Sequence, residues 1–247
     1  MPLNDAHDEA IRTMEFGSPA AATRVVIIPG LGLPSYVIPT ATALAVRGMA
    51  CSVLDLPGFG STSSLSCAPD VTAMGRAAAA WIARLPVATR VVVMGHSTGS
   101  QAALTAALDV QHSRPDAALV MAGPTFHPAH RGPVGLALAT LTAYRDETLS
   151  ETVTVVPDLV RGHLRVVRII ASGMRDRPER RLAALRLPLV LTAGEHDTYA
   201  PRSWLETLAR AASRSPAVTS AVLAGSHNNL YTHPGALARL IDTALRA

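Results

Sequence analysis

The sequence predicts an α/β fold built on a doubly wound, mainly parallel sheet. Short runs rich in β-branched residues alternate with Ala- and Leu-rich stretches of helical pattern, which is typical of parallel βα units. A chain of 247 residues, 49% of them hydrophobic, is also long enough to bury one large core. Strands are expected at residues 24–28, 50–54, 90–94, 118–121, 187–192 and 219–223. Helices are expected at residues 35–47, 70–85, 98–108, 201–212 and 234–246.

The alternation breaks once, between Gly123 and Leu187. This stretch shows no convincing buried strand and reads as helices interrupted by Pro and Gly. We therefore expect residues 124–186 to form a helical cap inserted into a core made of residues 1–123 and 187–247.

Composition excludes several classes of function. All 22 basic residues are Arg, which excludes the P-loop Lys of nucleotide hydrolases and a Schiff-base Lys. A net charge of +4 is too small for the basic stripe of a nucleic-acid-binding protein. Cys51 and Cys67 do not form a zinc or disulfide pattern, and no apolar stretch reaches membrane-spanning length. We expect a cytoplasmic protein without metal or organic cofactor.

The strongest motif is the pentapeptide at residues 95–99, Gly-His-Ser-Thr-Gly, between an expected strand and an expected helix. A sharp turn there exposes the Ser97 hydroxyl, while Gly95 and Gly99 leave room for neighbouring backbone. The free N–H groups at the helix start suit a developing oxyanion. Ser97 is therefore the candidate nucleophile, and the alternative is a chance match.

A serine nucleophile needs a base and a carboxylate, in the chain order Ser, acid, His for this turn type. Asp197 follows the strand at 187–192 and His227 follows the strand at 219–223, so both lie where parallel strands end. Glu195 and His196 could exchange roles with Asp197, but an acid just before a helix-starting Pro favours Asp197. The other histidines are interpreted as structural or solvent-facing: His112, His127, His130, His163 and His233.

These motifs resemble the α/β-hydrolase superfamily over essentially the whole chain. Besides the elbow at Ser97, residues 55–61 (DLPGFGS) are similar to the D-x-P-G-x-G-x-S segment of many capped members, and Gly225-Ser226-His227 is similar to their terminal G-x-H. The resemblance implies an oxyanion hole made by the backbone N–H groups of Leu31 and Thr98. One departure is Pro29-Gly30, where members commonly carry His-Gly.

The expected cap is rich in charge, with ten arginines against six acids. Arg161, Arg165 and Arg168 share one helical face and could attract an anionic substrate, although a solvated face is the preferred interpretation. Nine aromatic residues in the whole chain favour an aliphatic acyl group over a sugar or stacked ring.

Together these features predict a serine hydrolase that cleaves a carboxylic ester, lactone or thioester of a small, largely apolar acyl substrate. The same triad would also serve acyl transfer, C–C bond hydrolysis or perhydrolysis, and a ligand-binding protein that kept the triad is a further alternative. Oligomeric state is left open between monomer and dimer.

Overall fold

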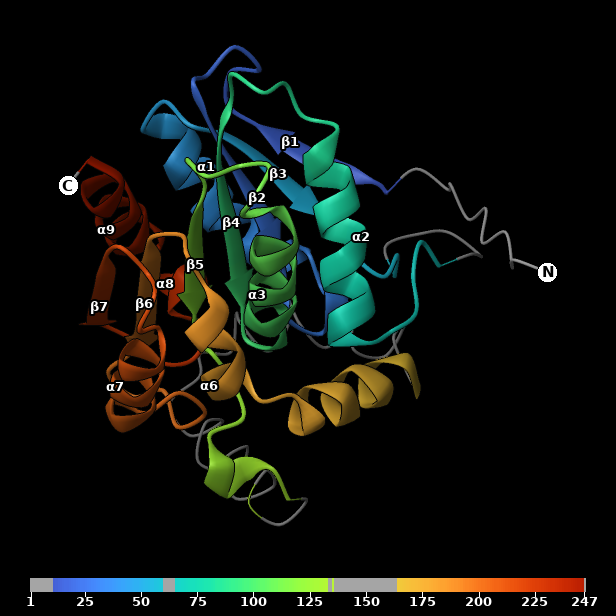
Figure 1. The fold of residues 1–247 in the computed structure, drawn as a ribbon, viewed down its shortest axis with the longest axis vertical. Coiled ribbons are helices and arrows are strands. Elements are labelled where there is room, and N and C mark those ends of the chain that lie inside the picture. The colour runs from blue at the N-terminus through green and yellow to red at the C-terminus, as the bar shows by residue number, and fades with distance from the viewer. Residues whose placement is uncertain (1–10, 60–64, 133–134, 136–163, 247) are drawn as a thin grey trace.

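A computed structural model of the chain describes residues 11–59, 65–132, 135 and 164–246. It contains a seven-stranded sheet in the order β1-β3-β2-β4-β5-β6-β7 (Figure 1). The six expected strands are present as β2 (Thr23–Ile28), β3 (Ala50–Leu54), β4 (Arg90–His96), β5 (Ala118–Ala122), β6 (Leu189–Gly194) and β7 (Val218–Leu223). These six strands are parallel, which confirms the predicted fold class.

One strand of the sheet was not among those predicted from the sequence. β1 (Thr13–Phe16) pairs antiparallel with β3 at the edge of the sheet, with Thr13 opposite Leu54. Only Met14 and Phe16 of its residues pack against the core, and they are only partly buried. Four residues with two apolar contacts give too short an alternation to be recognised as a strand.

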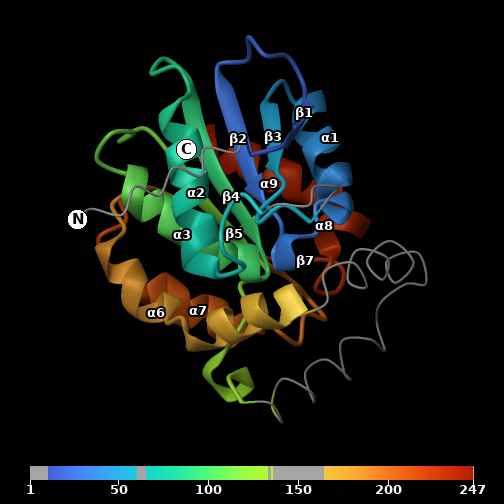
Figure 2. The same ribbon diagram turned by 90° about the vertical axis from the view of Figure 1, so that its right-hand side faces the viewer.

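Helices cover both faces of the sheet (Figure 2). α2 (Val71–Ala83), α3 (Thr98–Val110) and α7 (Arg202–Ala211) pack on one face, and α1 (Ile38–Val46) and α9 (Pro234–Arg246) pack on the other. The sheet itself supplies the middle layer: Val91 and Val93 of β4 face the first group of helices, and Val92 and Met94 face the second. This two-sided burial explains why the strands read as continuous apolar runs.

Helix boundaries follow local signals in the sequence. The Asp70 side chain accepts hydrogen bonds from the N–H groups of Thr72 and Ala73 at 2.9 and 3.2 Å, which caps the start of α2. α7 begins directly after Pro201, whose ring suits a helix start. None of the described helices is long and apolar enough to cross a membrane.

The segment expected to form the cap is described at residues 124–132, 135 and 164–186. It contains a 3-10 turn (Pro128–His130), a helix at residues 164–175, α6 (Pro178–Arg181) and a second 3-10 turn (Leu182–Ala184). No strand interrupts the described part of this segment. Whether it caps a substrate site stays a prediction.

Candidate active site

The turn at Ser97 is tight because backbone groups crowd it on both sides. Ser97 lies between β4 and α3 with φ 55° and ψ −127°, a conformation that non-glycine residues rarely adopt. A Cβ placed on Gly95 would lie 2.2 Å from the Gly99 carbonyl oxygen, and a Cβ on Gly99 would lie 2.2 Å from that of Ile28. Glycine is therefore required at both positions if the Ser97 hydroxyl is to stand at the carboxyl edge of the sheet.

Asp197 is a buried carboxylate held by backbone at the end of β6. Its Oδ1 accepts hydrogen bonds from the N–H groups of Tyr199 and Ala200, both at 2.9 Å, and the residue is 4% exposed. Burial opposes ionisation, but the adjacent His227 ring and the Ala200 N–H outweigh it, so the pKa of Asp197 lies below its usual value. Asp197 is thus a fixed anion at neutral pH.

His227 joins the aspartate to the serine. Its Nδ1 lies 3.0 and 2.9 Å from the two Asp197 carboxylate oxygens, and its Nε2 lies 3.0 Å from Ser97 Oγ. An anionic carboxylate can only accept, so Nδ1 carries the proton and Nε2 faces the hydroxyl as an acceptor. The structure therefore brings Ser97, His227 and Asp197 into one hydrogen-bonded line.

The competing acid and base lie elsewhere. The side chains of Glu195 and His196 are 54% and 62% exposed, and they lie 3.7 Å from each other. The two ring nitrogens of His227 are already occupied by Asp197 and Ser97. The geometry thus favours Asp197 over its neighbours.

The expected oxyanion turn has an unusual hydrogen bond. Leu31 occupies the left-handed region, with φ 53° and ψ 12°, inside the 3-10 turn η1 (Gly30–Gly32). Its N–H donates to the Thr98 hydroxyl at 2.8 Å. No hydrogen bond from the Thr98 N–H is seen among the described residues. One of the two expected donors is thus free for a ligand atom, and the other is held beside it by the Thr98 side chain.

Gly123 belongs to the site and was not singled out in the sequence. It directly follows β5 with φ 51°, and a Cβ there would lie 3.1 Å from His227 Cε1 and 3.2 Å from Asp197 Oδ2. The glycine leaves space for the imidazole and carboxylate to meet. A glycine directly after a buried strand and before Pro124 was the available signal.

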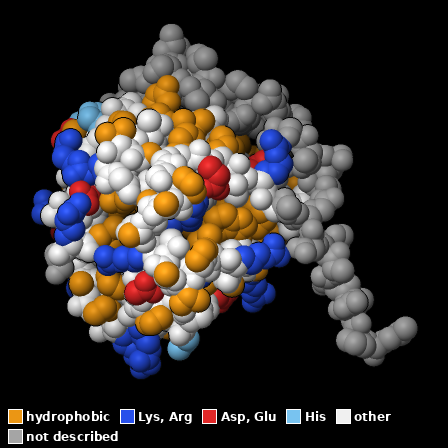
Figure 3. All heavy atoms as spheres, turned by 90° about the horizontal axis from the view of Figure 1, so that it is seen from above, with side chains coloured by type: hydrophobic (Ala, Val, Ile, Leu, Met, Phe, Trp, Pro, Cys, Tyr) orange, Lys and Arg blue, Asp and Glu red, His pale blue; other side chains and the backbone are white. Residues whose placement is uncertain are grey.

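The three arginines expected to bind substrate are only partly described. Arg161 lies outside the described residues, and Arg165 and Arg168 are exposed on the helix at residues 164–175. Within the described part of the chain, neither forms an ion pair with an acid. Figure 3 shows arginines and acids interspersed on the face it draws, without a continuous band of one charge.

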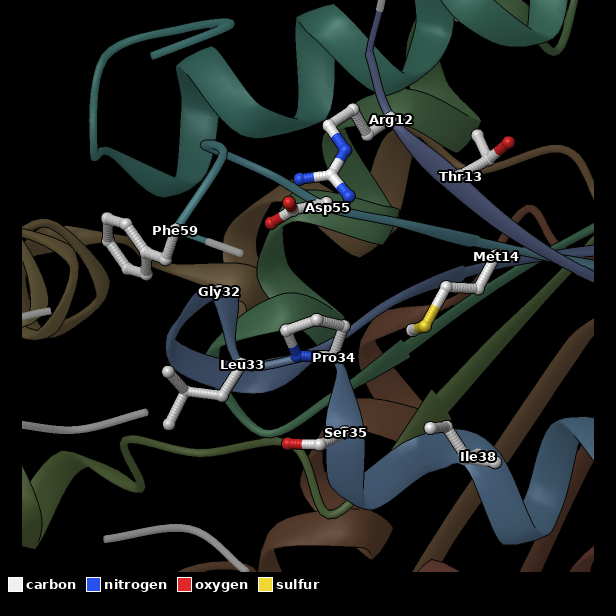
Figure 4. A pocket seen from close by; sticks show the side chains of 10 residues that line it. All are labelled: Arg12, Thr13, Met14, Gly32, Leu33, Pro34, Ser35, Ile38, Asp55 and Phe59. Carbon is white, nitrogen blue, oxygen red and sulfur yellow. The ribbon is translucent and has the colours of Figure 1, made fainter. Parts of the chain in front are cut away.

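A cavity lies beside the Leu31 turn (Figure 4). This cavity of about 210 Å³ is bounded by the start of β1, the residues after η1 and the loop after β3. Its lining residues are Arg12, Thr13, Met14, Gly32, Leu33, Pro34, Ser35, Ile38, Asp55 and Phe59. The Arg12 and Asp55 side chains point toward one another in Figure 4. Ser97, Asp197 and His227 are not among the residues that line it.

The described residues contain no group of side chains that could bind a metal ion. No three His, Cys, Asp or Glu side chains gather there as a metal ion would need. Cys51 is buried and Cys67 is partly buried, and burial raises the pKa of both thiols to about 12.

The family model for the alpha/beta hydrolase family matches residues 25–240. The chain belongs to the alpha/beta hydrolase family. A search of curated proteins finds no match in sequence.

Three solved structures of this family resemble the chain closely in fold. A lipase-esterase related protein from Clostridium acetobutylicum has a TM-score of 0.72 at 15% identity, over 94% of this chain and 98% of that one. A type II thioesterase of the yersiniabactin biosynthetic pathway has a TM-score of 0.68 at 18% identity, over 95% and 98%. An enol-lactonase from Burkholderia xenovorans has a TM-score of 0.68 at 17% identity, over 96% of each chain. At these identities the likeness establishes the fold alone.

Proposed function

We propose that this hydrolase-family chain is a serine hydrolase that cleaves an ester-type bond through Ser97, His227 and Asp197. The observation that carries the proposal is the unbroken line from Ser97 Oγ through the His227 ring to the Asp197 carboxylate. Nucleophile, base and orienting acid are recognised by this geometry rather than by position in the chain. Each sits at the end of a different strand, so the sheet fixes their relative positions.

The proposed reaction has two halves. Ser97 Oγ attacks the substrate carbonyl as its proton passes to His227 Nε2, and the carbonyl oxygen becomes an oxyanion. His227 returns the proton to the leaving alcohol or thiol, which leaves an ester of Ser97. Water attacks this acyl-enzyme with His227 again as base, and the acid product leaves with Ser97 restored. The Asp197 anion stabilises the His227 cation in both halves.

The oxyanion would be held by backbone N–H groups. The Thr98 N–H begins α3, where the positive end of the helix dipole also favours negative charge. The Leu31 N–H is the second donor, once the substrate oxygen replaces the Thr98 hydroxyl as its acceptor. We further propose that residues 124–186 form the cap over this site.

The substrate class proposed is a carboxylic ester, lactone or thioester with a small, largely apolar acyl group. Support comes from the low aromatic content of 4% and from the fold shared with an esterase-related protein, a thioesterase and an enol-lactonase. Fold and triad do not separate hydrolysis from acyl transfer, because the acceptor that attacks the acyl-enzyme decides between them.

A substrate panel tests the proposal. The purified protein is assayed with p-nitrophenyl esters of increasing chain length, with a thioester and with a lactone, in parallel with labelling by a fluorophosphonate. We expect repeated turnover on at least one ester and labelling at Ser97. Labelling without turnover in water, but with product in the presence of an added alcohol, would indicate an acyltransferase. A protein that binds these compounds without labelling or turnover would refute the enzyme proposal.

A further inference from the structure

A second line of hydrogen bonds runs through the core beneath the Ser97 site. The Gly30 N–H donates to the Tyr36 hydroxyl oxygen at 2.6 Å. The same oxygen lies 2.8 Å from His96 Nδ1, and His96 Nε2 lies 2.9 Å from the His227 carbonyl oxygen. Tyr36 is 5% exposed and His96 is 1% exposed, so water does not compete for these contacts.

The direction of each bond in this line follows from its two ends. The His227 carbonyl can only accept, so His96 Nε2 carries a proton and donates. Burial, and then the neighbouring His227 ring, lower the pKa of His96 to about 3, so the imidazole is neutral and Nδ1 is an acceptor. Tyr36 must then donate to Nδ1 while its oxygen accepts from Gly30. Burial raises the pKa of the Tyr36 hydroxyl, which keeps that proton in place.

The line connects the three backbone segments on which the proposed chemistry depends. Gly30 immediately precedes Leu31, the proposed oxyanion donor, and His96 immediately precedes Ser97. The third segment is the His227 loop itself. The rings are also packed together, with centroids 5.3 Å apart for Tyr36 and His96 and 4.8 Å apart for His96 and His227.

The turn at Gly30 is shaped to admit Tyr36. A Cβ on Gly30 would lie 2.8 Å from the Tyr36 hydroxyl oxygen and 2.7 Å from Ser97 Cβ. Glycine therefore lets the turn approach the tyrosine and the serine at once. Because the Leu31 turn begins at this glycine, a shift of the Gly30 N–H would carry the Leu31 N–H with it.

We propose that Tyr36 and His96 are positioning residues that hold the Leu31 turn and the His227 loop in register with Ser97. The inference rests on the proposed serine hydrolase function. Neither side chain touches the reacting atoms; each acts through a backbone group. A neutral His96 also leaves His227 as the ring that takes up the proton beside Ser97, because a cation at His96 would oppose a second one 4.8 Å away.

The first test compares Tyr36→Phe with Tyr231→Phe. Both tyrosines pack in the same apolar cluster, but only Tyr36 hydrogen-bonds to the line. Loss of an oxyanion donor costs 10²–10³ in kcat in a well-studied case, so displacement of one should lower kcat for a p-nitrophenyl ester by about 10-fold or more in Tyr36→Phe. We expect KM to stay within about 2-fold, since an oxyanion contact is made in the transition state and adds little to binding of the ground-state substrate. Tyr231→Phe should keep wild-type kcat.

The second test is a double-mutant cycle with His96→Gln. Glutamine keeps a donor that reaches toward the His227 carbonyl but offers Tyr36 no ring nitrogen. Because both substitutions break the same line, Tyr36→Phe with His96→Gln should lose little more than the worse single variant. If the loss of kcat in the double variant equals the product of the losses in the two single variants, Tyr36 and His96 do not act through one shared line of hydrogen bonds. Nitrogen-15 NMR of the histidine rings should show His96 with its proton on Nε2, and a proton on Nδ1 would overturn the assigned direction.

The outcomes separate this inference from the function on which it rests. A wild-type protein without turnover or labelling refutes the serine hydrolase, and the positioning role falls with it. An active wild-type protein whose Tyr36→Phe variant keeps full kcat, well below its melting temperature, overturns the positioning role alone. A Tyr36→Phe variant with lower stability but unchanged kcat would likewise overturn the positioning role.

Discussion

The carboxyl edge of the sheet and the segment after β5 use charge in opposite ways. At the edge, one buried carboxylate, Asp197, is held by backbone N–H groups and points at one histidine. In residues 124–186, arginines pair with nearby acids: Arg131 makes two bonds to Glu179 at 2.9 and 2.7 Å, and Arg181 bonds Asp176 at 2.8 Å.

This difference indicates what each region contributes. The Asp197 carboxylate, fixed at a strand end, is available to orient His227. The Arg131 charge is neutralised by Glu179 and contributes to packing. Arg131 also lies 5.7 Å over the Trp204 ring and donates to the Phe126 carbonyl, so it ties the start of the inserted segment to α7 and α6. Arg131 and Arg181 therefore stabilise the attachment of this segment, and we expect catalysis to depend on the sheet edge.

The largest difference between the two regions is expected from Ser97→Ala. Removal of the nucleophile should lower kcat by roughly 10⁶-fold, as in the best-studied serine hydrolase, and abolish fluorophosphonate labelling. Ser113→Ala, at an exposed serine after α3, should change neither. Ester turnover and mass spectrometry of the labelled peptide measure both effects. Labelling at another serine would refute Ser97 as the nucleophile.

The next effect separates Asp197 from its neighbour. Asp197→Asn should lower kcat by about 10⁴-fold, because the amide no longer fixes the His227 tautomer. Glu195→Gln, two residues earlier and half exposed, should leave kcat within about 2-fold. Turnover of the same ester at pH 8 compares the two. The reverse ranking would place the acid at Glu195.

Most of this edge could be predicted from the sequence because its signals are local. The turn at Ser97 and the strand ends at Asp197 and His227 each combine a strand pattern with the next few residues. Tyr36 and His96 could not be ranked in this way. Their proposed positioning role depends on contacts between segments that are distant in the chain, such as that of Tyr36 with His96.

Less could be predicted from the sequence for residues 124–186. The spacing of Arg161, Arg165 and Arg168 predicts a shared helical face, but spacing alone does not tell whether a face meets substrate or solvent. Arg131 and Glu179 are separated by 48 positions, so their pairing had no local signal.

A pair of glycine substitutions sharpens the contrast between the two regions in stability. Gly99→Ala forces a Cβ to within 2.2 Å of the Ile28 carbonyl oxygen and should lower the free energy of unfolding by at least about 2 kcal/mol. Gly132→Ala in the inserted segment meets no described atom within 4 Å and should change it by less than about 0.5 kcal/mol. Urea denaturation measures both values. Equal changes in the free energy of unfolding would mean that the turn at Ser97 accommodates the added Cβ without strain.

The burial of His96 should make the free energy of unfolding depend on pH in the acid range. Its folded pKa of about 3 lies below the ordinary value of 6.5, so between these values the unfolded chain binds more protons. The free energy of unfolding should therefore fall as pH drops below 6.5, with His96 contributing up to about 1.4 kcal/mol per pH unit. His96→Gln should flatten this slope, and His112→Gln, at an exposed position, should not. Urea titrations between pH 4 and 7 test this; equal slopes for both variants would contradict it.

The smallest effect is expected at the exposed arginines. Replacement of Arg165 and Arg168 by Gln should change KM by less than about 2-fold for both a carboxylated and a neutral ester, because exposed charges are screened by water and salt. The two KM values at low and high salt are the measurement. A rise of several fold in KM for the carboxylated ester alone would indicate that Arg165 and Arg168 recruit the substrate.

The backbone at Ser97 places stability and activity in conflict at a single residue. Its φ of 55° is held by the packed elbow, and conformations of this kind cost of order 1–3 kcal/mol for a residue with a side chain. Glycine accepts the same dihedral angles without that strain. Ser97→Gly should therefore melt at a higher temperature than the native chain while having no nucleophile. A laboratory evolution experiment that selects only for heat resistance would be expected to replace this serine, whereas one that selects for ester turnover would be expected to keep it.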